Sequence, residues 1–440
     1  MLTPSEDAHL IVFGRYPRVG KTKTRLIPAL GPAGAAALQK RLAEKTVAAA
    51  RQAAKRIGSR LVFCHDGGHR KQLCRWLGDR RIRYVAQADG DLGRRMHRAI
   101  HRAFEDGARR VVLVGTDIPG LTAGRLKQAF SALNQNDLVF GPSTDGGYWL
   151  VGMTKPENIF DGIVWGRPDV LEKSLALARN KGMRPQMLAP LNDLDTPDDL
   201  TREKGGDYVP PPYLSVIIPV IDAARQMART LAAAASPDAE IIVSDGGSTD
   251  RTLQIARTLG ARIVFGPRSR AGQQNRAAAA ARGEVLLFLH ADTRLPRNYV
   301  NHVFETLMDR RTRMGAFRFA TRIHTPAMRC IAFCTNLRAG WLKLPCGDQG
   351  LFLRQRDFTE IGGFPEVSIA EDLYLSRRMA GKGRIVIAPA AAVSSGRRWR
   401  HLGLLRTTMI KTMLAVGILA GVSPGRLASL YRLPPKKTNL

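Results

Sequence analysis

The chain has 440 residues, 44% of them hydrophobic, and a formal net charge of +31 from 68 Lys and Arg against 37 Asp and Glu. This length and apolar content suit two or three folded domains and exclude a disordered chain. Five cysteines are too few and too scattered for a disulfide framework or a paired-CxxC zinc site, so we expect reduced thiols in a cytoplasmic protein.

Short apolar runs alternate with helical patterns along the first half of the chain. Strands are expected at residues 10–13, 60–63, 111–114 and 137–140, and helices at residues 33–57, 94–105 and 123–133. A stretch rich in Gly and Pro at residues 204–213 is typical of a linker. It would separate a domain over residues 1–203 from a domain over residues 214–400.

The same plan then starts again. Strands are expected at residues 214–218, 240–243, 262–265 and 285–289, and helices at residues 223–235, 249–259 and 271–281. Continuous apolar strands that alternate with helices predict an α/β fold with two tandem Rossmann-like domains and mostly parallel sheets. Ligands of such sheets bind at the carboxyl ends of the strands.

Each half places one aspartate directly after a buried strand. Asp117 follows the strand at residues 111–114, and Asp292 follows the strand at residues 285–289. A divalent cation that bridges two phosphates needs only one or two carboxylates in addition to substrate oxygens. The alternative is that each carboxylate caps a helix or turn. Because the feature occurs in both halves in one context, we favour binding of Mg²⁺ or Mn²⁺.

The second half carries further acidic groups. Asp245 and Asp250 lie in a loop with two glycines, where Asp245 can accept hydrogen bonds from a nucleobase or ribose. Glu371 and Asp372 precede a helical stretch at residues 373–379. A carboxylate beside a sugar hydroxyl can act as a general base while a cation neutralises a diphosphate leaving group. Together these are the parts of an inverting glycosyl transfer.

At these residues the chain resembles the family-2 glycosyltransferases, which have the nucleotide-diphospho-sugar-binding fold called GT-A. The resemblance covers about residues 214–399 and opens with Val216-Ile217-Ile218-Pro219. It implies that Asp245 contacts the nucleotide and that Asp292 binds the metal and the diphosphate. It also implies that Asp372 is the catalytic base, with Glu371 beside it.

Three positions depart from the family pattern or extend it. Arg397-Arg398-Trp399 is similar to the end of the QxxRW motif, which implies that Arg398 and Trp399 lie near the donor or the acceptor, but Ser395 stands where Gln is usual. We therefore do not expect a processive polymerase. Asp222-Ala223 replaces the usual Asn-Glu, and His290-Ala291-Asp292 replaces the usual DxD motif, so one nucleotide contact and one carboxylate are missing.

Three motifs, at residues 270–275, 290–293 and 346–350, resemble bacterial glycosyltransferases associated with arsenosugar biosynthesis. This narrower resemblance, whose first motif begins at Arg270, implies that Arg270 belongs to the substrate site, where we also expect Asp250. It also implies that Asp348 and Gln349 line the acceptor side.

A basic cluster follows the first strand of the chain. Five residues separate Gly14 from Gly20, whereas the phosphate-binding P-loop of ATPases needs four, so we exclude that motif. Lys21, Lys23 and Arg25 suit a diphosphate or a triphosphate, and the alternative is a solvated loop.

Residues 10–200 resemble an uncharacterised GT-A-like family related to nucleotidyltransferases of the molybdenum-cofactor type. The resemblance rests on the segments at residues 91–96, 115–119, 141–149 and 193–200. It implies that Lys23 and Arg25 hold phosphates, that Asp117 and Asp195 bind a metal, and that Asp145 forms a wall of the substrate site. The run from Asp195 to Leu200 can equally begin a helix, with Thr and Pro in its first turn.

The basic tail at residues 401–440 is amphipathic. No Asp or Glu follows Asp372, and the apolar run at residues 413–422 is too short to cross a bilayer, for which about 20 residues are needed. Such a tail can lie on an anionic membrane at its inner face, or it can be an ordinary solvated surface.

The sequence thus predicts a bifunctional enzyme whose second domain transfers a sugar from a nucleotide-diphospho-sugar donor to an acceptor. The first domain would be a second glycosyltransferase-like unit, a nucleotidyltransferase that makes the activated sugar, or a catalytically silent binding module. The basic charge also suggests nucleic acid, but it is spread along the chain, only 6% of the residues are aromatic, and no nucleic-acid-binding module is visible. We therefore expect no nucleic-acid partner.

Overall fold

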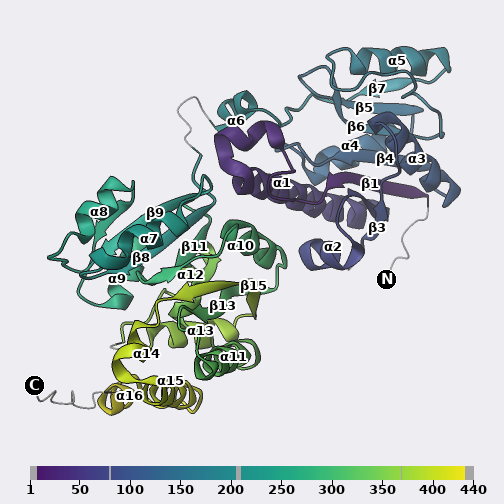
Figure 1. Ribbon diagram of the computed structural model, residues 1–440. Helices are drawn as coiled ribbons and strands as arrows, with labels where there is room; N and C mark the ends of the chain where they lie inside the picture. The colour runs from purple at the N-terminus through teal and green to yellow at the C-terminus, as the bar shows by residue number, and fades with distance from the viewer. Residues whose placement is uncertain (1–6, 79–80, 205–209, 368, 432–440) are drawn as a thin grey trace, which may run out of the picture. The chain divides into compact units, whose positions relative to one another are not determined.

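The computed structural model describes residues 7–78, 81–204, 210–367 and 369–431. The chain divides into two compact units, Met1–Pro210 and Pro211–Leu440 (Figure 1). This boundary lies inside the segment expected as a linker, of which residues 205–209 fall outside the described residues.

The first unit is built on a sheet with the strand order β3-β2-β1-β4-β6-β5-β7 among its described residues. Its strands are β1 (Ala8–Arg15), β2 (Arg60–Asp66), β3 (Arg83–Ala86), β4 (Arg110–Gly115), β5 (Leu138–Pro142), β6 (Tyr148–Met153) and β7 (Pro185–Met187). Strand β6 runs antiparallel to β4 and β5, and the other pairs are parallel. The apolar side chains of Ile11, Phe140 and Val151 are buried in one core with Ile100 of a covering helix.

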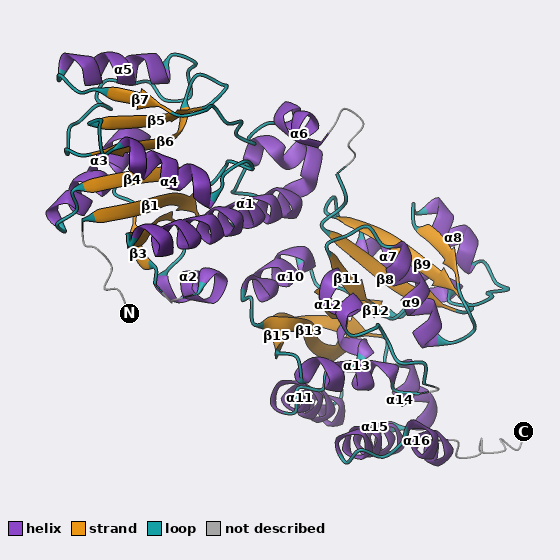
Figure 2. Ribbon diagram, turned by 180° about the vertical axis from the view of Figure 1, so that it is seen from behind, coloured by secondary structure: helices purple, strands orange, loops and turns teal. Residues whose placement is uncertain are grey.

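The helices of this unit pack on the two faces of the sheet (Figure 2). They are α1 (Ile27–Ile57), α2 (Arg70–Leu77), α3 (Leu92–Glu105), α4 (Ala123–Ala132), α5 (Val170–Asn180) and α6 (Pro197–Lys204), with a 3₁₀ turn at Thr24–Leu26 before α1. Helix α1 is kinked at Gly31, which has a φ of 73° and precedes Pro32. The helix is capped at its C-terminal end by Gly58, which has the left-handed conformation. The helix expected at residues 33–57 is the part of α1 after this kink.

The second unit is built on a sheet with the order β10-β9-β8-β11-β14-β13-β15-β12 among its described residues. Its strands are β8 (Leu214–Val220), β9 (Ala239–Asp245), β10 (Arg262–Phe265), β11 (Val285–Phe288), β12 (Thr293–Arg294), β13 (Thr312–Thr321), β14 (Leu351–Arg354) and β15 (Arg384–Ser394). Strand β14 runs antiparallel to β11 and β13, while β8–β11 are mutually parallel. Ile217, Ile242, Leu286 and Leu351 from this sheet share one core.

Helices follow most of these strands. They are α7 (Ala224–Ala234), α8 (Thr252–Thr258), α9 (Arg270–Ala280), α10 (Tyr299–Met308), α11 (Pro326–Trp341), α12 (Gln355–Glu360), α13 (Glu371–Ala380), α14 (Arg397–Leu402), α15 (Leu404–Leu419) and α16 (Pro424–Tyr431), with a 3₁₀ turn at Gly347–Gln349. Within the described part of the chain, no helix combines the length and the hydropathy needed to cross a membrane.

The two sheets repeat one plan. In each, the first strand lies between the second and the fourth, and an antiparallel strand pairs with the fourth. The predicted α/β fold with mostly parallel sheets is confirmed. The antiparallel strands β6 and β14 were not predicted, because a strand buried on both faces has the same apolar pattern in either direction.

Candidate functional site

A cavity of about 660 Å³ opens in the second unit where strands β8 and β11 end. It is lined by Asp222 after β8, Asp292 after β11, Glu371 and Asp372 at the start of α13, and Trp399 in α14. The expected catalytic pair, the expected metal ligand of this unit and one residue expected near the donor or the acceptor therefore share one cavity. Arg270 and Asp348 line it as well.

Two loops at this edge of the sheet are joined by hydrogen bonds between residues far apart in the sequence. Asp222 accepts hydrogen bonds from the backbone N–H groups of Thr249 and Asp250, at 2.8 and 3.3 Å. Asp222 has a left-handed φ of 49°, which its short polar side chain tolerates. The amide of Gln273 donates to the carbonyls of Val220 and Ser244, at 2.8 and 3.1 Å, and fixes the ends of β8 and β9.

Two expected substrate contacts lie outside this cavity. Asp245 is buried, and its carboxylate accepts hydrogen bonds from the N–H groups of Gly247 and Ser248 at 3.0 and 3.1 Å. Asp250 accepts hydrogen bonds from the hydroxyl and the N–H of Thr252 and from the N–H of Ala224, and these bonds, that of the Thr252 hydroxyl above all, lower its pKa. Since both carboxylates are engaged by the backbone, in this structure they order the loops instead of lining the cavity.

The catalytic pair has two different environments. Burial raises the pKa of Glu371, and the nearby Asp372 carboxylate adds to the effect, while Arg270, 3.4 Å from Glu371 Oε1, partly offsets it. Asp372 accepts hydrogen bonds from the N–H groups of Gly347, at 2.6 Å, and of Leu373, at 2.8 Å. Asp372 is therefore held in a fixed orientation at the cavity wall, beside a carboxyl group that resists ionisation.

Asp348 forms a second charged group of the wall. Its carboxylate lies 3.0 Å from Nδ1 of His290 and 2.5 Å from Nζ of Lys411, which is also 4.1 Å from the centre of the Trp399 ring. Burial opposes ionisation of Asp348, but Lys411 and His290 outweigh it and hold its pKa well below the usual range. Asp348 thus carries a negative charge that Lys411 and the contact with His290 already compensate.

Gln349 and Arg398 are the remaining expected residues of this unit. Gln349 is buried, accepts a hydrogen bond from the N–H of Cys346 at 3.1 Å and donates to the carbonyl of Phe317 at 3.0 Å. It therefore supports the turn that carries Asp348 and does not line the cavity. The side chain of Arg398 falls outside the described part of the structure.

Asp292 accepts a hydrogen bond from the hydroxyl of Ser395 at 2.6 Å. Ser395 stands where the family-2 pattern has Gln, so the departure places a short donor beside the expected metal ligand. Several arginines lie near Asp292. Burial, and then the charges of Arg294, Arg229 and Arg400, lower the pKa of Arg322, while the charge of Asp292 raises it. Such surroundings favour a phosphate-bearing ligand.

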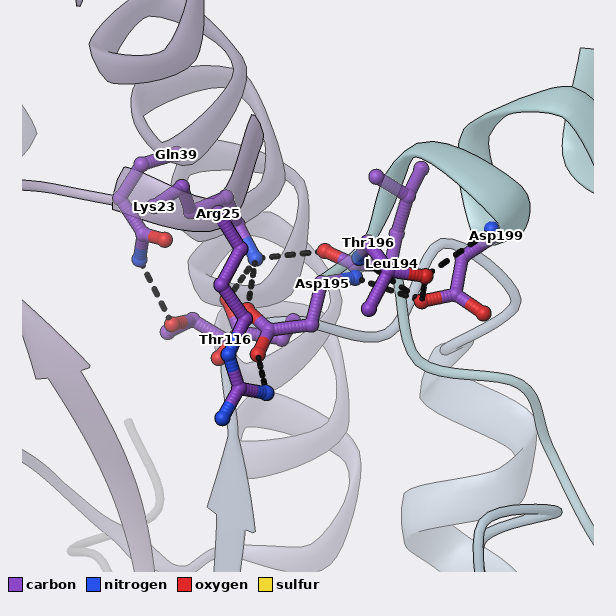
Figure 3. A network of polar contacts seen from close by, with 9 residues as sticks. Lys23, Arg25, Gln39, Thr116, Leu194, Asp195, Thr196 and Asp199 are labelled. Atoms are coloured by element: carbon purple, nitrogen blue, oxygen red, sulfur yellow. Dashed lines mark hydrogen bonds and ion pairs between the residues drawn. The ribbon is translucent and has the colours of Figure 1, made fainter. Parts of the chain in front are cut away.

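A smaller cavity of about 310 Å³ lies in the first unit, at the carboxyl ends of β1 and β4. Lys23, Arg25, Asp117 and Asp195 all line it. Nζ of Lys23 donates to the carbonyl of Leu194 at 2.6 Å and lies 2.8 Å from Asp117 and 3.4 Å from Asp195 (Figure 3). The two carboxylates expected to bind a cation both pair with this buried ammonium group, and their role as metal ligands stays a prediction.

Asp195 stands directly before a capped helix. Asp199 accepts hydrogen bonds from the N–H and hydroxyl of Thr196, at 2.8 and 2.7 Å, and its own N–H donates to the Thr196 hydroxyl at 3.3 Å (Figure 3). Helix α6 begins with Pro197. The helix-start interpretation of this segment is therefore confirmed, while Asp195 itself pairs with Lys23 and Arg25.

Asp145 lies outside this cavity lining and accepts a hydrogen bond from the N–H of Gly147 at 3.0 Å in its own turn. The sequence analysis assigned no role to its neighbour Asp193. Burial, followed by the charge of Asp145, raises the pKa of Asp193 to about 6.

The residues present can hold a divalent cation only with the help of substrate oxygens. Among the described residues, no group of three or more His, Cys, Asp or Glu side chains could bind a metal ion. In the second unit, Ser395 is the one side-chain donor to Asp292 in the described residues, so a carboxylate oxygen remains for a cation. One carboxylate with diphosphate oxygens is sufficient for Mg²⁺.

Several polar cavity residues were not predicted as site residues, among them His290, Lys411 and Arg338. His290 was visible in the motif that ends at Asp292, but only the aspartate was assigned. Lys411 and Arg338 line the cavity from α15 and α11. They had no local signal, because each stands on a helix without a motif and reaches the site only through packing.

Comparisons with known proteins agree with the division into units. Residues 29–167 match a family described as uncharacterized proteins conserved in bacteria (DUF2064), and residues 215–329 match glycosyl transferase family 2. The second unit thus carries a family-2 glycosyltransferase domain, as predicted. No curated protein matches the chain.

Three solved structures illustrate what the chain is similar to. A Desulfovibrio desulfuricans G20 protein assigned to the nucleotide-diphospho-sugar transferases is 35% identical over 45% of this chain and 85% of its own, with a TM-score of 0.41. A Pyrobaculum calidifontis mannosyltransferase with GDP-Man and Mn²⁺ is 20% identical over 47% of this chain and 65% of its own, with a TM-score of 0.37. A Mycobacterium tuberculosis glucosyl-3-phosphoglycerate synthase with Mn²⁺ and UDP is 17% identical over 47% of this chain and 80% of its own, with a TM-score of 0.35.

Proposed function

Because the chain belongs to the nucleotide-diphospho-sugar transferases, we propose that its second unit transfers a sugar from a nucleotide-diphospho-sugar to an acceptor hydroxyl, with inversion. The observation that carries the proposal is the position of Asp292 and Asp372 in the lining of one cavity of about 660 Å³. A nucleotide sugar needs a cavity of several hundred Å³. The narrower likeness to enzymes of arsenosugar biosynthesis remains a prediction.

In this reaction Asp372 takes the proton of the acceptor hydroxyl. The acceptor oxygen then bonds to the anomeric carbon, and the bond from that carbon to the diphosphate breaks, which releases a nucleoside diphosphate. The N–H groups of Gly347 and Leu373 orient the Asp372 carboxylate. The raised pKa of the neighbouring Glu371 disfavours a second negative charge beside Asp372.

Asp292 would hold a divalent cation together with the diphosphate. The cation would neutralise charge on the leaving group. The arginines around Asp292 favour the same anion.

The first unit would bind the phosphates of a nucleotide in its smaller cavity. Arg15, Lys23, Arg25 and Arg95 line this cavity and supply the positive charge. We propose a second glycosyltransferase-like unit, and the products distinguish it from the two alternatives. A nucleotidyltransferase releases pyrophosphate, and a silent binding module releases nothing.

The test uses the full chain with a panel of nucleotide sugars, sugar phosphates and nucleoside triphosphates in Mg²⁺ or Mn²⁺. Released nucleoside diphosphate and pyrophosphate are measured separately. Asp372→Asn should remove the release of nucleoside diphosphate by the second unit. Lys23→Gln should reduce only the product release that depends on the first unit. If the chain neither binds nor consumes any nucleotide sugar of the panel, the proposal fails.

A further inference from the structure

The exposed apolar side chains of the chain are concentrated on a few late helices. Ten of the fifteen large hydrophobic side chains that are exposed among the described residues fall between positions 333 and 419. Most of them stand on α11 and α15, which lie in contact at one end of the second unit (Figure 2). The concentration is unlike the scattered exposed hydrophobics of an ordinary surface.

Helix α15 has an apolar outer face. Leu405, Met409, Met413 and Val416 are spaced by four, four and three residues, so they form one stripe along the helix. Leu405 and Met409 are 83% and 71% exposed, whereas Leu414 and Ile418 on another face are buried in the unit. Helix α15 is therefore apolar on its buried face and on its exposed face, whereas a surface helix usually exposes a polar face.

Helix α11 repeats this arrangement. Phe333, Leu337 and Trp341 are spaced by four residues and are 67%, 41% and 80% exposed. Met328 and Ala339 face the unit and are buried. Trp341 is the most exposed aromatic side chain among the large hydrophobics of the described residues.

The charge around the two helices has one sign. No Asp or Glu occurs between residues 310 and 347 or after Asp372, while Lys343 follows α11 and Arg406 lies in α15. Apolar side chains beside cations, without any acidic residue in these segments, complement an anionic lipid surface. Two copies of the same face would bring like charges together, which disfavours self-association.

We propose that the exposed faces of α11 and α15 form a docking surface for an anionic lipid bilayer. This docking surface consists of Phe333, Leu337, Trp341, Leu405, Met409, Met413 and Val416. Each helix has 16 residues. At a rise of about 1.5 Å per residue, each is about 24 Å long, which is shorter than the bilayer core of about 30 Å. The helices therefore lie in the plane of the interface and do not cross it.

The docking surface differs from the lipid-binding tail considered from the sequence. That expectation placed the contact in residues 401–440 alone, whereas the structure brings in α11, which ends at Trp341, well before the tail begins. Helices α11, α14 and α15 also contribute Arg338, Leu402 and Lys411 to the lining of the larger cavity. A bilayer bound here would thus touch elements that form the cavity wall.

The experiment is cosedimentation of the full chain with vesicles, measured without any nucleotide sugar. Wild-type chain should pellet with phosphatidylcholine vesicles that contain phosphatidylglycerol, at physiological ionic strength, and bind pure phosphatidylcholine much more weakly. The double variant Trp341→Ser/Leu405→Ser should bind the anionic vesicles at least about tenfold more weakly. Lys343→Gln/Arg406→Gln should lose most of the preference for anionic lipid.

The matched control is Phe265→Ser/Leu259→Ser, which removes exposed apolar side chains elsewhere in the same unit and should leave binding unchanged. Thermal unfolding verifies that all variants are folded. The proposal is overturned if the wild type does not pellet with anionic vesicles, or if the Trp341/Leu405 variant binds as well as the wild type. It is also overturned if that variant instead dissolves a dimer seen by sedimentation velocity. The readout is lipid binding, so an inactive chain that binds vesicles would refute only the proposed transfer.

Discussion

Nζ of Lys23 lies 2.8 Å from Oδ1 of Asp117, and its side chain is only 3% exposed. The ammonium group holds together three segments of the first unit, since it also contacts the carbonyl of Leu194 and the carboxylate of Asp195. Without its two carboxylates this buried cation would lack charge compensation.

The double variant Asp117→Asn/Asp195→Asn should therefore destabilise the first unit by about 1–3 kcal/mol, because a buried charged donor loses its charged acceptors. Urea unfolding measures the change. Arg15→Gln, which breaks the exposed ion pair between Arg15 and Asp66 at the same cavity, should cost about 0–1 kcal/mol. An equal decrease in the free energy of unfolding in the two variants would show that the contacts of Lys23 stabilise the unit no more than an exposed ion pair does.

Asp372→Asn should lower the rate of sugar transfer by about 10²–10⁴-fold, since the amide cannot accept the acceptor's proton. Donor binding should persist, because the amide oxygen of Asn can still accept the Gly347 N–H. Turnover and calorimetric donor binding are measured side by side, with Glu360→Gln, an exposed carboxylate away from the cavity, as the control. Full turnover in the Asn variant would exclude Asp372 as the base.

Asp292→Ala should weaken cation-dependent donor binding by more than Ser395→Ala. Loss of a partner that merely orients a metal ligand costs about 10–100-fold in metal affinity, and loss of the ligand itself should cost at least as much. Thermal-shift titrations with donor, with and without EDTA, measure the effect. Unchanged donor affinity in both Asp292→Ala and EDTA would indicate a site that works without metal.

Asp193 should make the first unit less stable as the pH rises. Its pKa is about 6 in the folded chain against an ordinary value of 3.8, so between these values the folded state binds a proton that the unfolded state has lost. Stability falls with pH in that window, because the folded state binds more protons there. Thermal unfolding across the window measures the trend.

Asp193→Asn should unfold at a higher temperature than the wild type at pH 7 and at about the same temperature below the window. The exposed Asp89→Asn serves as the charge-matched control. A parallel shift of Asp193→Asn at all pH values would contradict the raised pKa.

The strands that position the site were predictable from local patterns. Residues 111–114 and 285–289 are continuous apolar runs, and an aspartate after such a run must lie at the sheet edge where ligands bind. Lys411 could not be found this way, because its contact with Asp348 joins positions 63 residues apart through the packing of α15. The contact of Asp245 with a nucleotide stays a prediction, and the sequence did not show that the backbone N–H groups of Gly247 and Ser248 donate to its carboxylate.

The cavity wall is tightly packed at Gly347, next to His290 and Asp372. A methyl group on Gly347 would lie 2.4 Å from Nε2 of His290 and 3.2 Å from Oδ2 of Asp372. No other amino acid fits there unless the imidazole and the carboxylate move apart. The main chain at Gly347 therefore packs directly against both groups, and any larger residue there would widen the gap between the histidine and the carboxylate.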